Sequence, residues 1–251
     1  NKLGIKDVQT WDLSFISEKL REAKFSYSEN EVKQYFTEPA VLKGMFGLVE
    51  KMFSIKIKEK KAPVWNEDVK FFVIEDKDGK EIAGFYMDLY ARSGKRGGAW
   101  MNDQISRREV DGKIQKPIAY LVCNFAAPVG DNPSLLTLRD VETIFHEFGH
   151  GLHHMLTRQT ELAVSGISGV EWDAVEMPSQ FMENFVLNWD VMQTITHHVK
   201  TGKTMPRELF DKLVAAKNYG AGMANVRQIE FALFDMLLHM DTHPQKDTVN
   251  K

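Results

Sequence analysis

The alternation of hydrophobic and polar residues divides the chain into three blocks. Residues 1–60 carry apolar side chains at the three- and four-residue spacing of helices, which predicts a helical block. Residues 68–126 contain short apolar runs separated by turn residues, which predicts a β-rich block. Residues 137–241 return to helical spacing. Because no linker separates the blocks, we expect residues 1–251 to form a single α+β segment that is predominantly α-helical.

Local signals place several boundaries inside these blocks. Ser28 and Glu31 match a capping box, which predicts a helix start. The Asp-Gly pair at 78–79 predicts the turn of a β-hairpin, and the apolar run at 116–125 predicts a further strand. Thr137 is expected to begin the helix that follows, with Asp140 beside it. Later helices are expected at residues 174–200, 206–217 and 222–241.

Composition excludes some classes of protein. A net charge of −3 without a basic block argues against nucleic acid as a partner. The most apolar run, residues 117–129, is interrupted by Asn124 and is too short to cross a bilayer, so no membrane partner is expected. The single cysteine, Cys123, cannot form an intrachain disulfide, which favours a reducing compartment and hence the cytoplasm. The chain begins with Asn, so we expect it to be a piece of a longer protein.

The helix predicted around residues 141–156 carries candidate metal ligands. On a helical wheel its apolar residues fall on one side, while His146 and His150 fall on the other. Histidines four residues apart have Cβ atoms about 5–6 Å apart, so both neutral imidazoles can bind one Zn²⁺. Glu147 points beside the pair, where it can take a proton from a metal-bound water. His-Glu-x-x-His on a helix is the metallopeptidase signature for this reason.

The simplest alternative is that these histidines only cover a polar helix face. The clean separation of histidines from apolar residues argues against it. We expect His153 and His154 to be solvated or to support the site indirectly, because the metzincin pattern would need a histidine where the chain has Leu156.

A catalytic zinc usually has three protein ligands and an open position. The glycines in residues 165–169 allow the chain to turn back towards the histidines. On a second wheel Glu176 and Ser179 share a polar face opposite Phe181. Glu176, near the start of that helix, is our choice, and Glu183 remains a rival. Asp173 can equally be a helix cap or a partner of a histidine. The downstream candidates are Glu161, Glu171, Asp173, Glu176 and Glu183.

Several stretches together resemble the thimet oligopeptidase (M3) family of zinc peptidases. They are "FHEFGHGLHHML", "SGISGVEWDAVEMPSQFMEN" and "DLYARSGKRGGAWM", and the resemblance covers essentially the whole chain. The second stretch favours the oligopeptidase branch over the peptidyl-dipeptidases, which tend towards "SGT…RDFVE". The resemblance implies one Zn²⁺ per chain, held by His146, His150 and Glu176, with Glu147 as the general base.

The resemblance also implies a fold and a substrate class. Members have a zincin-like catalytic core, mostly helical, with a small β-sheet beside the active-site helix. They are expected to act as monomers on short unstructured peptides inside a deep channel. Residues 96–101 are then a candidate strand on the substrate side. The family's "HxFAGGYxAGYYxY" segment is absent from this sequence, so we expect a catalytic-domain fragment without its full oxyanion support.

The function expected is zinc-dependent hydrolysis of internal peptide bonds in short oligopeptides. The alternatives left open are a peptidyl-dipeptidase of the same family and a catalytically incomplete zinc-binding fragment or peptide-binding module. A purely structural zinc needs no general base, so the presence of Glu147 speaks for an enzyme.

Overall fold

The computed structural model describes residues 7–240. Within them the chain divides into two compact units, one formed by residues 7–26 and 211–240 and the other by residues 27–210. The sequence pattern led us to expect a single segment and gave no sign of this division. The candidate site lies wholly in the second unit.

The first unit is helical. It contains a short 3-10 helix, helix α1, the C-terminal part of α7 and the long helix α8. Their bounds are Thr10–Asp12 for the 3-10 helix, Leu13–Phe25 for α1, Arg207–Ala216 for α7 and Ala221–Met240 for α8.

The second unit combines helices with a small β-sheet. Its helices are α2 (Glu29–Lys33), α3 (Glu38–Phe53), α4 (Leu138–Met155), α5 (Met177–Glu183) and α6 (Trp189–Ile195), with a 3-10 turn at Leu162–Val164. Its strands are β1 (Lys56–Glu59), β2 (Lys70–Glu75), β3 (Glu81–Tyr90), β4 (Trp100–Ile105), β5 (Arg108–Val110), β6 (Lys113–Gln115) and β7 (Ile118–Phe125). The α+β architecture predicted from the sequence is therefore confirmed.

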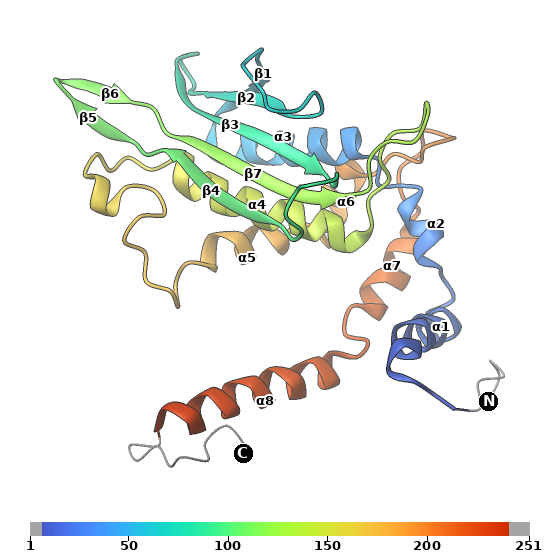
Figure 1. The fold of residues 1–251 in the computed structure, drawn as a ribbon. Helices are drawn as coiled ribbons and strands as arrows, with labels where there is room; N and C mark the ends of the chain where they lie inside the picture. The colour runs from blue at the N-terminus through green and yellow to red at the C-terminus, as the bar shows by residue number, and fades with distance from the viewer. Residues whose placement is uncertain (1–6, 241–251) are drawn as a thin grey trace. The chain divides into compact units, whose positions relative to one another are not determined.

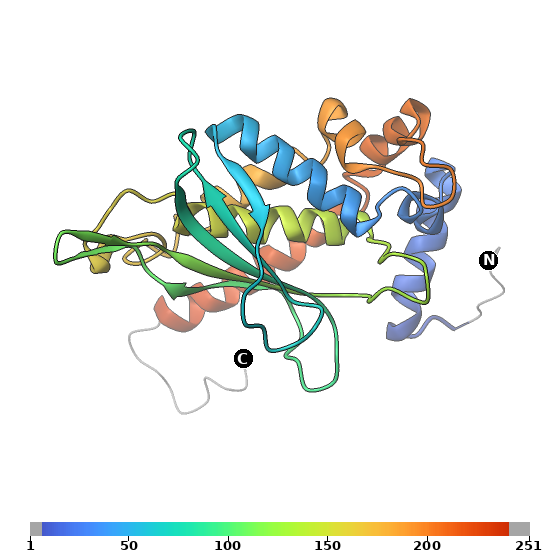
Figure 2. The same cartoon turned by 90° about the horizontal axis from the view of Figure 1, so that it is seen from above.

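The main sheet has five strands in the order β1-β2-β3-β7-β4 (Figure 1). Neighbouring strands are antiparallel except β3 and β7, which run parallel. β4 is thus an edge strand, while β5 and β6 form a separate hairpin. Both α3 and α4 lie against one face of the sheet (Figures 1 and 2), α4 beneath β7 and β4. In a further layer, α5 packs on α4 and α6 packs on α3.

The core lies between the sheet and these two helices. Phe148 of α4 contacts Phe85 of β3 and Phe46 of α3 through their rings. Phe85, Phe145 and Phe148 are fully buried. Burying a side chain of this size contributes roughly 1.5–3 kcal/mol. The apolar side of α4 is fixed in the core, so its polar side must face out of it.

Several boundary predictions are confirmed. The pair at 78–79 forms the turn between β2 and β3, with Gly79 at φ 77°. The run at 116–125 contains β7. Ser28 caps α2, accepting a hydrogen bond from the backbone N–H of Glu31 at 3.1 Å.

Two predicted helical ranges are too long. The helical block of residues 1–60 ends at Phe53, because Ser54 adopts a left-handed conformation (φ 54°) that terminates α3. Residues 56–59 then form β1, which pairs antiparallel with β2. The helix expected at 174–200 is two short helices, α5 and α6, because the Asn188 side chain accepts from two backbone N–H groups and starts α6 anew.

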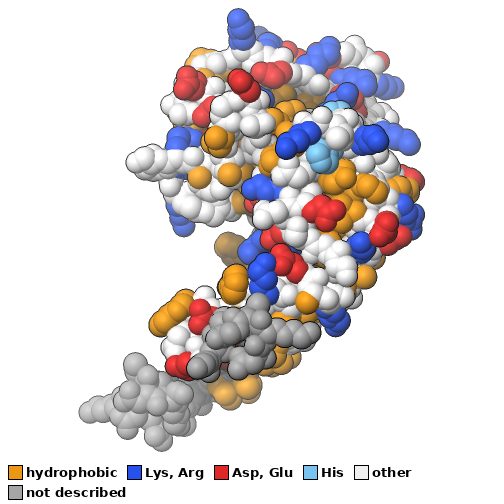
Figure 3. Space-filling model, turned by 90° about the vertical axis from the view of Figure 1, so that its right-hand side faces the viewer, with side chains coloured by type: hydrophobic (Ala, Val, Ile, Leu, Met, Phe, Trp, Pro, Cys, Tyr) orange, Lys and Arg blue, Asp and Glu red, His pale blue; other side chains and the backbone are white. Residues whose placement is uncertain are grey.

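The remaining expectations from composition are tested only in part. No helix within residues 7–240 is long and apolar enough to cross a membrane. Lys and Arg side chains are interspersed with Asp and Glu on the face shown in Figure 3. That mixture is consistent with the expected lack of affinity for nucleic acid, which stays a prediction.

A buried ion network anchors the segment that leads into β4. The Asp88 carboxylate accepts hydrogen bonds from Trp65 Nε1 (2.9 Å), both terminal nitrogens of Arg92 (2.6 and 2.8 Å) and Lys95 Nζ (2.8 Å). Burial alone would raise the pKa of Asp88, but these donors outweigh it and lower the pKa to about 2. Lys95 Nζ also reaches the carbonyl oxygens of Asp88, Tyr90 and Cys123.

Replacing Asp88 with asparagine should lower the free energy of unfolding at pH 7 by about 3–5 kcal/mol, because the buried Lys95 ammonium loses its counter-charge. The stabilisation that comes from the lowered pKa of Asp88 is complete above pH ~4 and is lost as the pH falls towards 2. Urea unfolding should therefore show the same difference from wild type at pH 7 and pH 5 and a smaller difference at pH 3. A difference that does not change with pH would contradict this, and Asp78→Asn in an exposed turn is the control.

Candidate metal centre

Helix α4 presents the candidate ligands because both its start and its buried side are fixed. Thr137 and Asp140 cap each other reciprocally: Asp140 accepts from the Thr137 N–H at 2.8 Å, and the Thr137 hydroxyl oxygen accepts from the Asp140 N–H at 3.1 Å. This is the helix start predicted from the sequence. Two turns further on, the helix turns His146, Glu147 and His150 towards a pocket of about 280 Å³.

Three side chains meet in this pocket as the sequence predicted. The Nε2 atoms of His146 and His150 each lie 3.2 Å from Oε2 of Glu176. The candidate ligand atoms of these residues all lie within 4.8 Å of one another. Tetrahedral zinc with bonds of about 2.0–2.1 Å separates its ligand atoms by roughly 3.3–3.4 Å. The spacing of the donors therefore fits a tetrahedral ion.

The chemistry of the donors also fits zinc. Burial lowers the pKa of His150, which favours the neutral imidazole that binds metals. Two imidazole nitrogens and one carboxylate oxygen are a common protein ligand set for catalytic zinc. The roles of His146, His150 and Glu176 as ligands stay a prediction, now supported by their arrangement.

Glu147 lies beside these three side chains and is buried, with 6% of its surface exposed. Burial raises the pKa of its carboxyl group to about 7, although His146 and a hydrogen bond from the backbone of Met101 oppose the shift. Met101 belongs to the edge strand β4 and lines the same pocket. Glu147 is thus held between the helix and the strand, with a pKa suited to taking up and giving back a proton near neutral pH.

Two further side chains hold the candidate ligands. Oε1 of Glu183 lies 2.5 Å from Nδ1 of His146, so this nitrogen donates and Nε2 keeps its lone pair towards the pocket. The buried hydroxyl of Ser179 lies 2.9 Å from Oε2 of Glu176 and 2.8 Å from its carbonyl oxygen. From the sequence, Glu183 was expected only as a rival ligand. Its position seven residues after Glu176, two turns along one helix face, is the signal for its supporting role.

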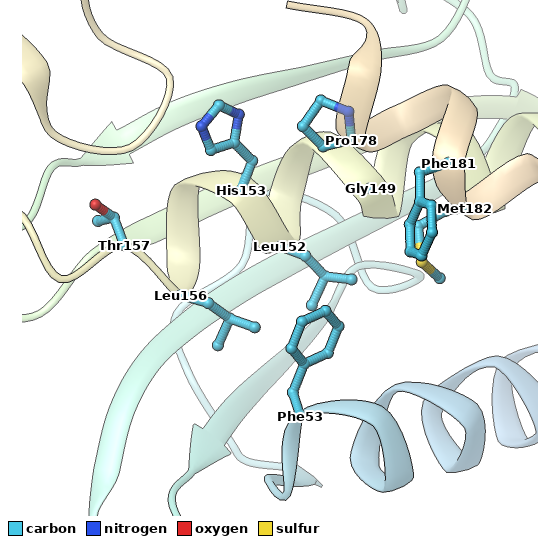
Figure 4. A pocket seen from close by; sticks show the side chains of 9 residues that line it. All are labelled: Phe53, Gly149, Leu152, His153, Leu156, Thr157, Pro178, Phe181 and Met182. Carbon is cyan, nitrogen blue, oxygen red and sulfur yellow. The ribbon is translucent and has the colours of Figure 1, made fainter.

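A close approach of two helices brings Glu176 to the histidines. Gly149, between the two histidines, faces Pro178 at the start of α5 (Figure 4) and also the adjacent Ser179. A Cβ atom at Gly149 would lie 2.5 Å from the Pro178 carbonyl oxygen. Only glycine lets α5 come this near, and Glu176 directly precedes α5.

Some sequence-based placements were wrong. Of the two alternatives expected for His154, solvation is wrong, because Gly166 and the end of β4 pack around the fully buried ring, while indirect support of the site stays a prediction. Ser179 lies on the buried side of α5 and Phe181 on the exposed side, since α5 meets α4 through Ser179. Phe181 instead lines an apolar pocket of about 310 Å³ with Phe53 and Leu152 (Figure 4).

The other ligand candidates do not join the metal group in the described chain. Glu161 precedes a 3-10 turn, and Glu171 and Asp173 are exposed in the loop before α5. Asp173 does not cap α5, whose cap position is Glu176 itself.

Replacing Glu183 with glutamine should weaken metal binding about 10–100-fold, because the His146 ring loses the carboxylate that orients it. Equilibrium dialysis against a zinc-buffered series measures this. Glu171→Gln, which removes an exposed carboxylate from the neighbouring loop, should bind metal like wild type. Equal affinities for both variants would show that Glu183 does not support His146.

A helix-borne His-Glu-x-x-His pair, a carboxylate from the following helix and a buried glutamate beside an edge strand are the features of metal-dependent hydrolases. The model of the family described as "Peptidase family M3" matches residues 1–251. The chain belongs to this family.

Curated relatives agree with the family match. Oligopeptidase A of Escherichia coli (strain K12) is 48% identical over 247 residues, which cover 98% of this chain and 36% of that protein. The organellar oligopeptidase A of Arabidopsis thaliana is 49% identical, over 91% of this chain and 30% of that protein. A dipeptidyl carboxypeptidase of Salmonella typhimurium is 36% identical, over 93% of this chain and 34% of that protein. The chain thus spans about a third of the length of these relatives.

Proposed function

We propose that this chain carries the catalytic metal centre of a zinc-dependent oligopeptidase that hydrolyses internal peptide bonds in short peptides. The convergence of His146, His150 and Glu176 beside the buried Glu147 carries the proposal. The activity, substrates and partners of the whole protein are part of the proposal, because the relatives extend well beyond the matched region.

His146, His150 and Glu176 would hold one zinc ion per chain, with Glu183 and Ser179 steadying two of them. When bound, zinc lowers the pKa of a water ligand towards ~7 and polarises the carbonyl of the bond to be cut. The neutral state favoured for His150 keeps a lone pair available for this role.

Glu147 would act as the general base. Its carboxylate accepts the proton of the attacking water and then passes that proton to the nitrogen of the leaving amine. Burial raises the pKa of this carboxyl group in the metal-free site to about 7, so the group is more basic than an exposed glutamate and better able to accept a proton. The hydrogen bond from the Met101 backbone keeps the carboxyl group beside the strand where a substrate would lie.

The edge strand β4 is the proposed substrate-binding strand. Ala99, Trp100 and Met101 line the metal pocket. Of the segment 96–101 expected as a strand, only Trp100 and Met101 belong to β4, while residues 96–99 form the loop before it. An extended peptide can pair with an exposed strand edge through main-chain hydrogen bonds. Such pairing does not depend on the sequence of the peptide. This supports short, unstructured peptides as substrates. The sheet beside the metal-binding helix likewise supports the zincin-like character of the core.

Two alternatives differ in products. A peptidyl-dipeptidase would release dipeptides from free C-termini, and the 36% identity to a dipeptidyl carboxypeptidase keeps it in view. The identity of 46–49% to several oligopeptidases A favours internal cleavage. A catalytically incomplete zinc-binding or peptide-binding module would bind peptides and cut none.

Product mapping on the full-length protein tests the proposal. Quenched peptides of 8–12 residues are incubated with the zinc-loaded protein, each with a free and an amidated C-terminus. We expect cleavage at internal bonds in both forms. Cleavage that needs a free C-terminus and yields dipeptides would replace the proposal with the peptidyl-dipeptidase reading, and binding without cleavage would replace it with the binding module.

Three expectations stay predictions. These are the monomeric state, the absence of membrane and nucleic-acid partners, and the cytoplasmic location. The relatives' names include both a cytosolic and an organellar form from Arabidopsis thaliana, so relatedness alone does not fix the compartment.

A further inference from the structure

His154, in the last turn of α4, is completely buried and has no place in the mechanism above. Burying an imidazole is costly unless its polar atoms find partners. Its Nε2 atom lies 3.0 Å from the carbonyl oxygen of Ile105, so Nε2 donates this hydrogen bond. Ile105 is the last residue of β4. The contact therefore attaches the end of the edge strand to the metal-binding helix.

A second attachment joins the same strand to the same side of the helix. Glu147 and His154 are seven residues apart, which is about two helical turns. Glu147 accepts a hydrogen bond from the backbone of Met101, four residues before Ile105 in β4. The edge strand is thus held to α4 at two points, one beside the metal group and one at its far end.

The other side of the His154 ring contacts the loop that leads to the third ligand. A Cβ atom at Gly166 would lie 2.4 Å from Nδ1 of His154, and Gly166 has φ 66°. Only glycine fits this position without displacing the ring. Ser165 is also fully buried, and its hydroxyl donates to the Gln159 carbonyl oxygen at 3.2 Å. The start of the loop is therefore packed directly on His154.

This loop forms a wall of the metal pocket. Ile167, Trp172 and Val175 line the pocket, and the loop ends at Glu176. A second part of the pocket wall is the start of β4, with Trp100 and Met101. Both walls are connected to His154, the strand through Ile105 and the loop through Gly166.

We infer that His154 is a positioning residue that holds the edge strand β4 and the loop 165–176 at their places beside the metal group. Nδ1 of His154 has no hydrogen-bond partner within residues 7–240, so the ring acts through one hydrogen bond and its shape. The inference extends the proposed function, and its kinetic arm rests on that function. Its metal-binding arm does not.

The test compares His154→Leu with His154→Gln in the full-length protein. Leucine fills a similar volume but cannot donate to the Ile105 carbonyl, whereas the glutamine amide can. For His154→Leu we expect a changed visible absorption spectrum of bound Co²⁺, a Co²⁺ dissociation constant raised about 10-fold or more, and a KM for short peptides raised about 10-fold. For His154→Gln we expect values within about 3-fold of wild type. Gly166→Ala should reproduce the leucine variant from the loop side, because its new Cβ displaces the ring.

A control variant separates positioning from simple loss of stability. Val49→Ala, in the buried face of α3, lowers the unfolding temperature without touching the site. If His154→Leu matches Val49→Ala in unfolding temperature, Co²⁺ spectrum and KM, the role is structural and the inference is wrong. If His154→Gln fails as badly as His154→Leu, the hydrogen bond to Ile105 is not its basis. A wild-type protein that binds Co²⁺ but cleaves no peptide would overturn the proposed function, while the spectra would still decide the role of His154.

Discussion

Replacing Glu147 with glutamine should abolish peptide hydrolysis while zinc remains bound. Glutamine has nearly the same shape, and its amide oxygen can still accept from the Met101 backbone. It cannot take a proton from the attacking water. Losing a general base costs about 10²–10⁴-fold in rate. Because Glu147 is also the residue that would return the proton to the leaving amine, we expect the loss at the upper end of this range.

The measurement combines two quantities on the same full-length preparations. Zinc content is determined by elemental analysis, and kcat/KM is determined with an internally quenched peptide. Zinc content near that of wild type with kcat/KM reduced about 10⁴-fold is the expected pair of results. Activity that survives the change would show that Glu147 is not the general base. Glu171→Gln, an exposed neighbour outside the pocket lining, should change neither quantity.

Replacing Gly149 with alanine should disrupt the metal group through the backbone. The new Cβ would lie 2.5 Å from the Pro178 carbonyl oxygen and 2.6 Å from the Ser179 Cα, and neither can rotate away. Helix α5 must therefore move outward by about 1 Å, taking Glu176 from the two histidines. A displacement of that size costs on the order of 100-fold in rate, and overpacking costs about 1–3 kcal/mol of stability.

Two other glycine-to-alanine changes make a graded series with this one. Gly47 of α3 has no atom within 4 Å of its added Cβ, so alanine there should leave metal binding unchanged and stabilise the helix by about 0.5–1 kcal/mol. At Gly151 the nearest atom, at 3.0 Å, belongs to the flexible Leu121 side chain, so the effect should be small. Zinc affinity that is equal in all three variants would show that the approach of α5 at Gly149 does not control the site.

The parts of the site that could be predicted are those encoded within a few residues of one helix. His146, Glu147 and His150 lie within a span of little more than one helical turn, so helical geometry alone brings them together. The third ligand could be assigned only to the polar face of a later helix. The family resemblance was needed to choose Glu176 over Glu183.

The parts that escaped prediction depend on how separate elements pack. The contact of Glu183 with His146 exists because Gly149 lets α5 approach α4. The burial of His154 depends on a loop whose glycine fits against its ring. The strand β1 was missed because its short run of alternating polar and apolar residues comes soon after α3. No proline or glycine lies between the helix and the strand to mark the boundary. In each case the deciding atom belongs to another segment of the chain.

The edge strand β4 has a consequence for solubility. A strand with a free edge can pair with the same strand of a second molecule and so begin aggregation. Here α4 occupies two backbone groups of that strand, the Met101 N–H through Glu147 and the Ile105 carbonyl through His154, and the pairing register with β7 shifts between Asp103 and Ile105. These contacts and the shifted register interrupt the regular edge of β4. A peptide of a few residues can use it, while a long flat association between copies is discouraged.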